Sequence, residues 1–148
     1  MSLLKDIKAE REQVTENVRS LAKLMFMEMS ETVEAHHKVR PVVAALVGGM
    51  TELHFPTWRN DTEKVCAFAS ISAGLLERSA DAAICAFTGS MIYESTNAQP
   101  ALVLMVQTHD WKEMVVQPYD LENSEVTWLE PYTITDFDSP LIEISCAN

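Results

Sequence analysis

The sequence predicts a single α+β domain, residues 1–148, in which a long N-terminal helix and a second helix pack on a mainly antiparallel sheet of about five or six strands. Residues 3–34 contain neither Gly nor Pro, and their apolar residues recur every three or four positions. Two adjacent glycines separate a pair of strand-like segments. The later strand-like segments follow one another without crossover helices, which is typical of an α+β fold. With 148 residues, 47% of them hydrophobic, the chain can bury one sizeable core.

The first predicted helix covers residues 3–34. Its apolar stripe consists of Leu4, Ile7, Val14, Val18, Leu21 and Met25, a spacing that indicates one face packed against other elements. Around Met25, Phe26 and Met29 the helix is apolar almost all round. We therefore expect these three residues to need cover on more than one side, from the sheet and from a second copy of the chain.

A hairpin and a second helix are predicted next. Pro41 disfavours helical geometry at the residue before it, so strands should begin after it. Residues 42–47 and 50–55 flank Gly48 and Gly49, which supply the positive φ angles of a tight hairpin turn. Asn60 and Glu63 have the spacing of a helix N-terminal capping box. The second helix should begin there and end near residue 78.

The second half of the chain predicts further strands. Residues 82–93 and 101–106 are apolar with little alternation, as in central strands covered on both faces. Residues 111–117 and 126–129 predict antiparallel neighbours, and residues 131–148 an irregular acidic segment. We expect the two helices to cover one sheet face, which leaves apolar surface on the other face. That surplus predicts a homo-oligomer, most simply a twofold dimer.

Charge is unevenly distributed along the chain. The net charge is −11, and no Lys or Arg follows Lys112, whereas eight carboxylates do: Glu113, Asp120, Glu122, Glu125, Glu130, Asp136, Asp138 and Glu143. Uncompensated carboxylates repel polyanions, so we expect neither direct nucleic-acid binding nor attachment to an anionic membrane. The chain has no apolar run of bilayer-spanning length and no signal-peptide pattern. Its three cysteines suit a reducing compartment, and we expect a cytoplasmic location.

No sequence motif predicts catalysis, a cofactor or a metal site. Asp110, Trp111 and Lys112 reproduce a spacing found in metal-dependent nucleases, with Asp81 as a second carboxylate. That interpretation is disfavoured because the chain lacks a basic track for a phosphate backbone. The adjacent His36 and His37 would point about 100 degrees apart on a helix, which is unsuitable for chelating one metal.

These features predict a non-catalytic acidic protein that binds a basic surface of a protein partner, such as a small bacterial or viral accessory or inhibitor protein. The predicted contact residues are aromatic and acidic: Trp111, Glu113, Tyr119, Asp120, Glu122, Glu125, Trp128, Glu130, Asp136 and Asp138. Alternatively, Trp111 and Trp128 pair across neighbouring strands as part of the sheet. Two other functions stay open. One is a structural or assembly subunit. The other is an enzyme or small-molecule binder with a pocket between helix and sheet, where His54, His109 and Tyr93 converge.

Overall fold

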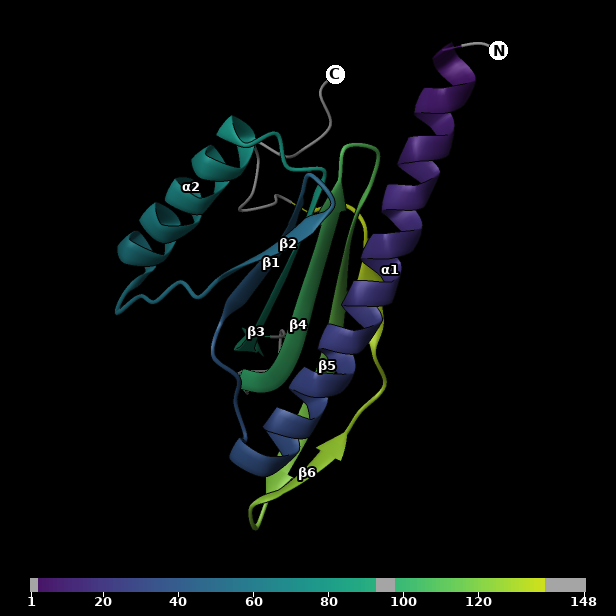
Figure 1. Cartoon of the computed structure of the whole chain (residues 1–148). Helices are drawn as coiled ribbons and strands as arrows, with labels where there is room; N and C mark the ends of the chain where they lie inside the picture. Colours follow the sequence, from purple (N-terminus) through teal and green to yellow (C-terminus); the bar gives the residue numbers. More distant parts are fainter. Residues whose placement is uncertain (1–2, 93–97, 138–148) are drawn as a thin grey trace.

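The computed structural model describes residues 3–92 and 98–137 of the chain. Its elements, in chain order, are α1 (Leu3–His36), β1 (Val42–Val47), β2 (Met50–His54), α2 (Asp61–Glu77), β3 (Ala82–Ile92), β4 (Ala98–Thr108), β5 (Lys112–Glu122), β6 (Glu125–Trp128) and β7 (Tyr132–Ile134). This is an α+β fold with a long N-terminal helix, and it confirms the predicted class (Figure 1). The sheet has seven strands, slightly more than expected.

All strand pairs of the sheet are antiparallel, in the order β2-β1-β3-β4-β5-β6. The long strand β5 pairs with β4 along one edge. Its other edge is shared between β7, opposite residues 114–116, and β6, opposite residues 119–122. The predicted central strands, β3 and β4, lie in the middle of the sheet and pair over their whole length.

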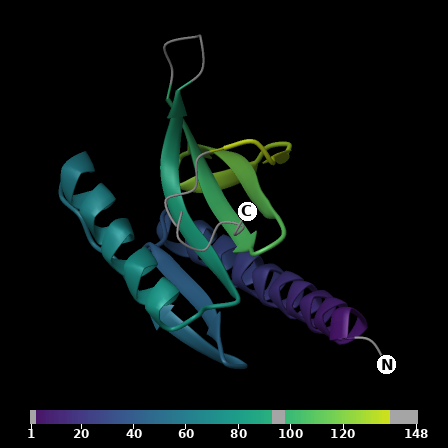
Figure 2. The ribbon, with the colours of Figure 1, turned by 90° about the horizontal axis from the view of Figure 1, so that it is seen from above.

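The two helices cover opposite faces of the sheet, contrary to the sequence expectation that one face would stay bare (Figures 1 and 2). Alternate residues of β1 illustrate this arrangement. Val42 and Ala44 belong to the core on the α1 side, whereas Val43 and Ala45 belong to the core on the α2 side. A strand enclosed between two apolar layers has no polar face, which explains why the central strands do not alternate in sequence.

The helix α1 extends two residues beyond the predicted range and ends at His36. His37 has a φ of 68°, and its amide donates to the carbonyl of Val33 at 2.7 Å. A residue in this left-handed conformation terminates a helix while satisfying one of its last carbonyl groups. The sheet-facing side of α1 buries Val18, Ala22, Met25 and Val33.

Local signals place the hairpin and α2 where the sequence predicts them. Gly48 and Gly49 have φ angles of 56° and 81° and form the turn between β1 and β2. Two consecutive positive φ angles match the twist of a hairpin and favour glycine. Asn60 caps α2 by accepting the amide of Glu63 at 2.8 Å.

A short strand, β7, lies in the segment that we expected to be irregular. Tyr132 and Ile134 of β7 are partly buried and pack against the core on the α2 side, whereas Thr133 between them is exposed. This alternation lets three residues pair with β5 although the surrounding sequence carries turn residues. The remainder of the segment, residues 138–148, lies outside the described residues. No helix in the described ranges is both long and apolar enough to span a bilayer.

Candidate binding groove and acidic end

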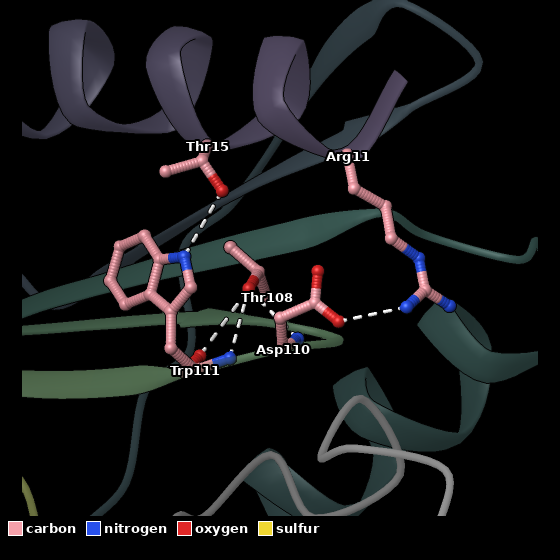
Figure 3. Close-up of polar contacts among 5 residues, drawn as sticks. All are labelled: Arg11, Thr15, Thr108, Asp110 and Trp111. Atoms are coloured by element: carbon pink, nitrogen blue, oxygen red, sulfur yellow. Dashed lines mark hydrogen bonds and ion pairs between the residues drawn. The ribbon is translucent and has the colours of Figure 1, made fainter. Parts of the chain in front are cut away.

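Trp111 fixes the turn between β4 and β5 to α1 (Figure 3). Its indole N–H donates to the hydroxyl of Thr15 on α1 at 3.1 Å. Its backbone amide donates to the hydroxyl of Thr108 at 3.2 Å, and the amide of Asp110 donates to the same oxygen. The guanidinium of Arg19 stacks over the Trp111 ring at 4.5 Å. A tryptophan that forms all these intramolecular contacts stabilises the fold, whatever else it binds.

Two arginines of α1 face carboxylates on the second half of the chain. Arg11 lies 3.0 Å from Asp110 (Figure 3), and Arg19 lies 3.9 Å from Glu113. From the sequence we expected the carboxylates of the second half to be uncompensated, and for Glu113 that expectation is wrong. The physical reason is that α1 runs alongside the start of β5, which brings charges nearly one hundred residues apart into contact.

The residues Asp110, Trp111 and Lys112, whose spacing resembles that of a nuclease site, all form contacts within the folded chain. Asp110 binds Arg11, and the Lys112 ammonium donates to the carbonyl of Phe137. Asp81 and Asp110 both line a hollow of about 390 Å³ beside the first turns of α1. Within the described ranges, no three His, Cys, Asp or Glu side chains are grouped as a metal site would require.

Tyr119 and Trp128, two predicted partner-binding residues, are packed on each other and on α1. They are opposite each other in the β5–β6 register, and their rings meet edge to face at 5.4 Å between centroids. Tyr119 is 2% exposed, and its hydroxyl donates to the carbonyl of His37 at 3.0 Å. Burial raises the pKa of Tyr119. The Trp128 indole donates to the Glu34 carboxylate at 2.7 Å. Trp128 thus pairs with Tyr119 across the strands, and not with Trp111.

Several carboxylates gather where the last turns of α1 meet the β5–β6 hairpin. The imidazole of His37 hydrogen-bonds with the carbonyl of Ser124 at 3.0 Å, and Trp128 holds Glu34. These contacts join two acidic segments that are far apart in sequence. We call this end of the molecule the acidic end and define it by Glu31 and Glu34 of α1 and Asp120, Glu122 and Glu125 of the hairpin, all of which are exposed.

Neutralising groups are few at the acidic end. Asp120 accepts a hydrogen bond from the Gln99 amide at 3.1 Å. Within residues 3–92 and 98–137, no ion pair joins its five carboxylates to a Lys or Arg. Lys38, exposed just beyond α1, is a nearby cation. Of the other predicted contact residues, Glu130 and Asp136 are exposed, and Asp138 lies outside the described residues.

The three residues predicted to mediate self-association contact the chain's own core. Met25 is 7% exposed, and Phe26 and Met29 pack against core residues of the sheet. The apolar segment of α1 is therefore largely covered within one chain, apart from Leu24 and Met27, which stay more than half exposed. Self-association stays a prediction.

A groove of about 480 Å³ runs between α1 and the outer part of the sheet. It is lined by Arg19, Ala22, Lys23, Phe26, Met27, Leu104, Val106, Trp111, Glu113, Val115, Gln117 and Pro131. A pocket between helix and sheet was one of the open alternatives from the sequence, but with different residues in it. His54 binds Glu52 on β2, His109 lines the separate hollow at the start of α1, and Tyr93 lies outside the described residues.

No sequence signal marks the groove, because its lining comes from both sides of a helix–sheet contact. Five of its residues come from α1, with Lys23 and Met27 one turn apart beside the sheet-facing stripe, and the others come from β4, β5 and the chain around these strands. These segments lie far apart in sequence and come together only in the folded chain, so no local pattern predicts the groove.

Two titratable groups elsewhere have clear structural explanations. Cys85 is fully buried in β3, and burial raises its pKa to about 12, so the thiol stays protonated and acts as a small apolar core residue. Glu52 on β2 accepts a hydrogen bond from Arg78, which holds the pKa of its carboxyl below the usual value. Neither group lines the groove or the acidic end.

No protein-family model, no curated protein and no solved structure matches this chain. Function must therefore be inferred from the residues themselves, since a fold alone does not assign one.

Proposed function

We propose that the protein is a non-catalytic binding protein whose acidic end docks on a basic surface of a protein partner. The observation that carries the proposal is that five exposed carboxylates, from the last turns of α1 and from the β5–β6 hairpin, lie at the same end of the molecule with few cations beside them. Like charges held close together create a field that attracts a cationic partner and accelerates its association.

Several groups at the acidic end are also held by hydrogen bonds within the chain, which favours specific binding over diffuse attraction. Glu34 is oriented by Trp128, Asp120 by Gln99, and the hairpin turn by His37. Ordering side chains before binding reduces the conformational entropy that is lost in the complex. The aromatic residues of this region act in the proposal as supports for the carboxylates, and not as the contact residues that the sequence suggested.

The wider proposal describes a cytoplasmic accessory or inhibitor protein that binds no nucleic acid directly and needs no cofactor or metal. Its support is the net charge of −11 and the absence of a basic track in the sequence. Homodimerisation remains part of the proposal, but the residues that support it differ from those predicted from the sequence. The exposed apolar residues at the start of α1, Leu3 and Leu4, now favour it more than Met25, Phe26 and Met29 do.

A fluorescent oligolysine peptide tests the acidic end, because the peptide carries the charge that the proposed partner surface must have. We expect binding that weakens steeply with salt, and a loss of about tenfold in affinity in the double variant Glu122→Lys, Glu125→Lys, because each substitution reverses a local charge. The matched control is Glu12→Lys, Glu16→Lys, which makes the same change in net charge on α1 far from the hairpin.

The control decides what the peptide recognises. Equal weakening in both double variants would mean that the peptide responds to net charge, and the acidic end would lose its assignment. Binding that is insensitive to salt would remove the electrostatic basis altogether. A partner captured from cells should follow the same order of variants as the peptide.

A further inference from the structure

The groove between α1 and β5 has the shape of a site for an extended chain. α1 runs parallel to β5, with Arg19 beside Glu113 near one end of the groove. Met27 and Gln117 stand further along the helix and the strand, respectively. From Arg19 to Met27 the helix rises about 12 Å, and from Glu113 to Gln117 the strand rises by about the same distance. The helix and the strand therefore form two walls of the groove of similar length.

The inner surface of the groove is apolar. Leu104 and Val106 of β4 are 4% and 3% exposed and lie deep, while Ala22, Phe26 and Val115 add apolar surface from the helix and from β5. The amide of Gln117 already donates to the carbonyls of Pro118 and Leu129. A peptide backbone laid in the groove would find few hydrogen-bond partners, and an alkyl chain needs none.

The rim of the groove carries two cationic side chains and one carboxylate, a local excess of positive charge that contrasts with the net charge of the whole chain. Arg19 and Lys23 are one helical turn apart on α1, and Glu113 lies across from them. Glu113 is 3.9 Å from Arg19, which also stacks on Trp111. Lys23 is exposed and forms no ion pair within the described ranges, so its charge is available to an incoming anion.

We propose that this groove binds a medium-chain fatty acid, with the acyl chain on the apolar surface and the carboxylate at Lys23. A chain of roughly eight to ten carbons matches a groove about 12 Å long. The volume of about 480 Å³ is in the range of small-molecule sites. The site is separate from the acidic end and does not depend on the function proposed for that surface.

Decanoate is the probe, and decanol is its uncharged counterpart. We expect saturable calorimetric binding of decanoate below its aggregation concentration. Lys23→Glu should weaken decanoate about tenfold or more and leave decanol unchanged, because only decanoate carries a charge for Lys23. The control Lys8→Glu makes the same charge change on an exposed part of α1 outside the groove and should alter neither ligand.

A second variant tests the location. Val115→Trp places a large side chain in the groove and should abolish binding of both ligands, with unfolding curves confirming that the variant is folded. Amide chemical-shift changes on adding decanoate should fall on residues 19–27 and 104–117. The variant Glu122→Lys, Glu125→Lys should bind decanoate normally, which separates this test from that of the acidic end.

Four results would overturn the proposal. Decanoate binding that survives Val115→Trp would place the ligand elsewhere, and binding unaffected by Lys23→Glu would remove the carboxylate assignment. Shift changes at the groove residues on concentrating the protein alone would identify a second copy of the chain as the occupant. Absence of decanoate binding altogether would remove the ligand class.

Discussion

The two ends of α1 have the same kind of sequence but different surroundings. Leu4 and Ile7 continue the apolar stripe that includes Val18 and Met25, yet Leu4 is 78% exposed and Met25 is 7% exposed. All of residues 3–13 are exposed, and the first turns of the helix extend past the end of the sheet (Figure 1). A periodic stripe thus shows which side of a helix is apolar, but it does not show how far the rest of the fold reaches along it.

The difference has an energetic meaning. The packed part of α1 is stabilised by burial on the sheet, whereas the first turns depend on helix propagation and a few surface contacts. Short helical segments without tertiary contacts are marginal in water. The first turns should therefore open before the rest of the domain unfolds.

The largest effect should come from removing a buried side chain of the packed part. Met25→Ala should lower the free energy of unfolding by about 2–4 kcal/mol, because the substitution leaves a cavity between α1 and the sheet. Leu4→Ala, on the exposed part, should change it by less than about 0.5 kcal/mol. Urea denaturation followed by circular dichroism measures both. A large loss in Leu4→Ala that depends on protein concentration would show that the first turns are covered by self-association.

A smaller effect should follow from cutting the polar link between α1 and the β4–β5 turn. Thr15→Val keeps the shape of the side chain but removes the acceptor of the Trp111 indole, and it should destabilise the domain by about 1 kcal/mol. Thr32→Val is the matched control, since the Thr32 hydroxyl donates within α1, to the carbonyl of Glu28. Equal losses in the two variants would mean that the link to Trp111 contributes nothing beyond helix propensity.

The smallest effect should be that of the ion pair nearest the exposed turns. The side chains of Arg11 and Asp110 are 58% and 42% exposed, so their interaction should contribute about 0.5 kcal/mol or less and should vanish at high salt. A double-mutant cycle of Arg11→Ala and Asp110→Ala, measured by urea denaturation at low and high salt, isolates this energy. A coupling that persists at high salt would show that the first turns are fixed more firmly than their exposure indicates.

The elements that the sequence predicts well are those with local signals. The Gly48–Gly49 turn and the Asn60 cap each depend on a few neighbouring residues, and both lie where they were expected. The order of helices and strands followed for the same reason, because apolar spacing and turn residues act over short distances along the chain.

The candidate sites were harder to predict, because each is assembled from distant segments. Arg11 and Arg19 neutralise carboxylates of the β4–β5 turn and β5, and the groove joins one flank of α1 to β5. The placement of the two helices on opposite faces could not be predicted from their apolar stripes either, because a stripe does not specify which face of a sheet it covers. Charge patterns therefore predicted a type of surface, and the fold determined which charges stay free.

The pairing of β1 with β3 joins two parts of the sheet that are each built from strands adjacent in sequence. β1 and β2 make one hairpin, and β3 to β6 follow one another as a meander, so each unit depends mainly on contacts between neighbouring strands. The β1–β3 pairing, which we call the seam, joins residues that are 36 to 44 positions apart in sequence, with α2 in the intervening chain. Closing that loop costs chain entropy, so we expect the seam to form late in folding. A slow step in refolding should then respond to substitutions in β1 and α2 more than to those in the meander.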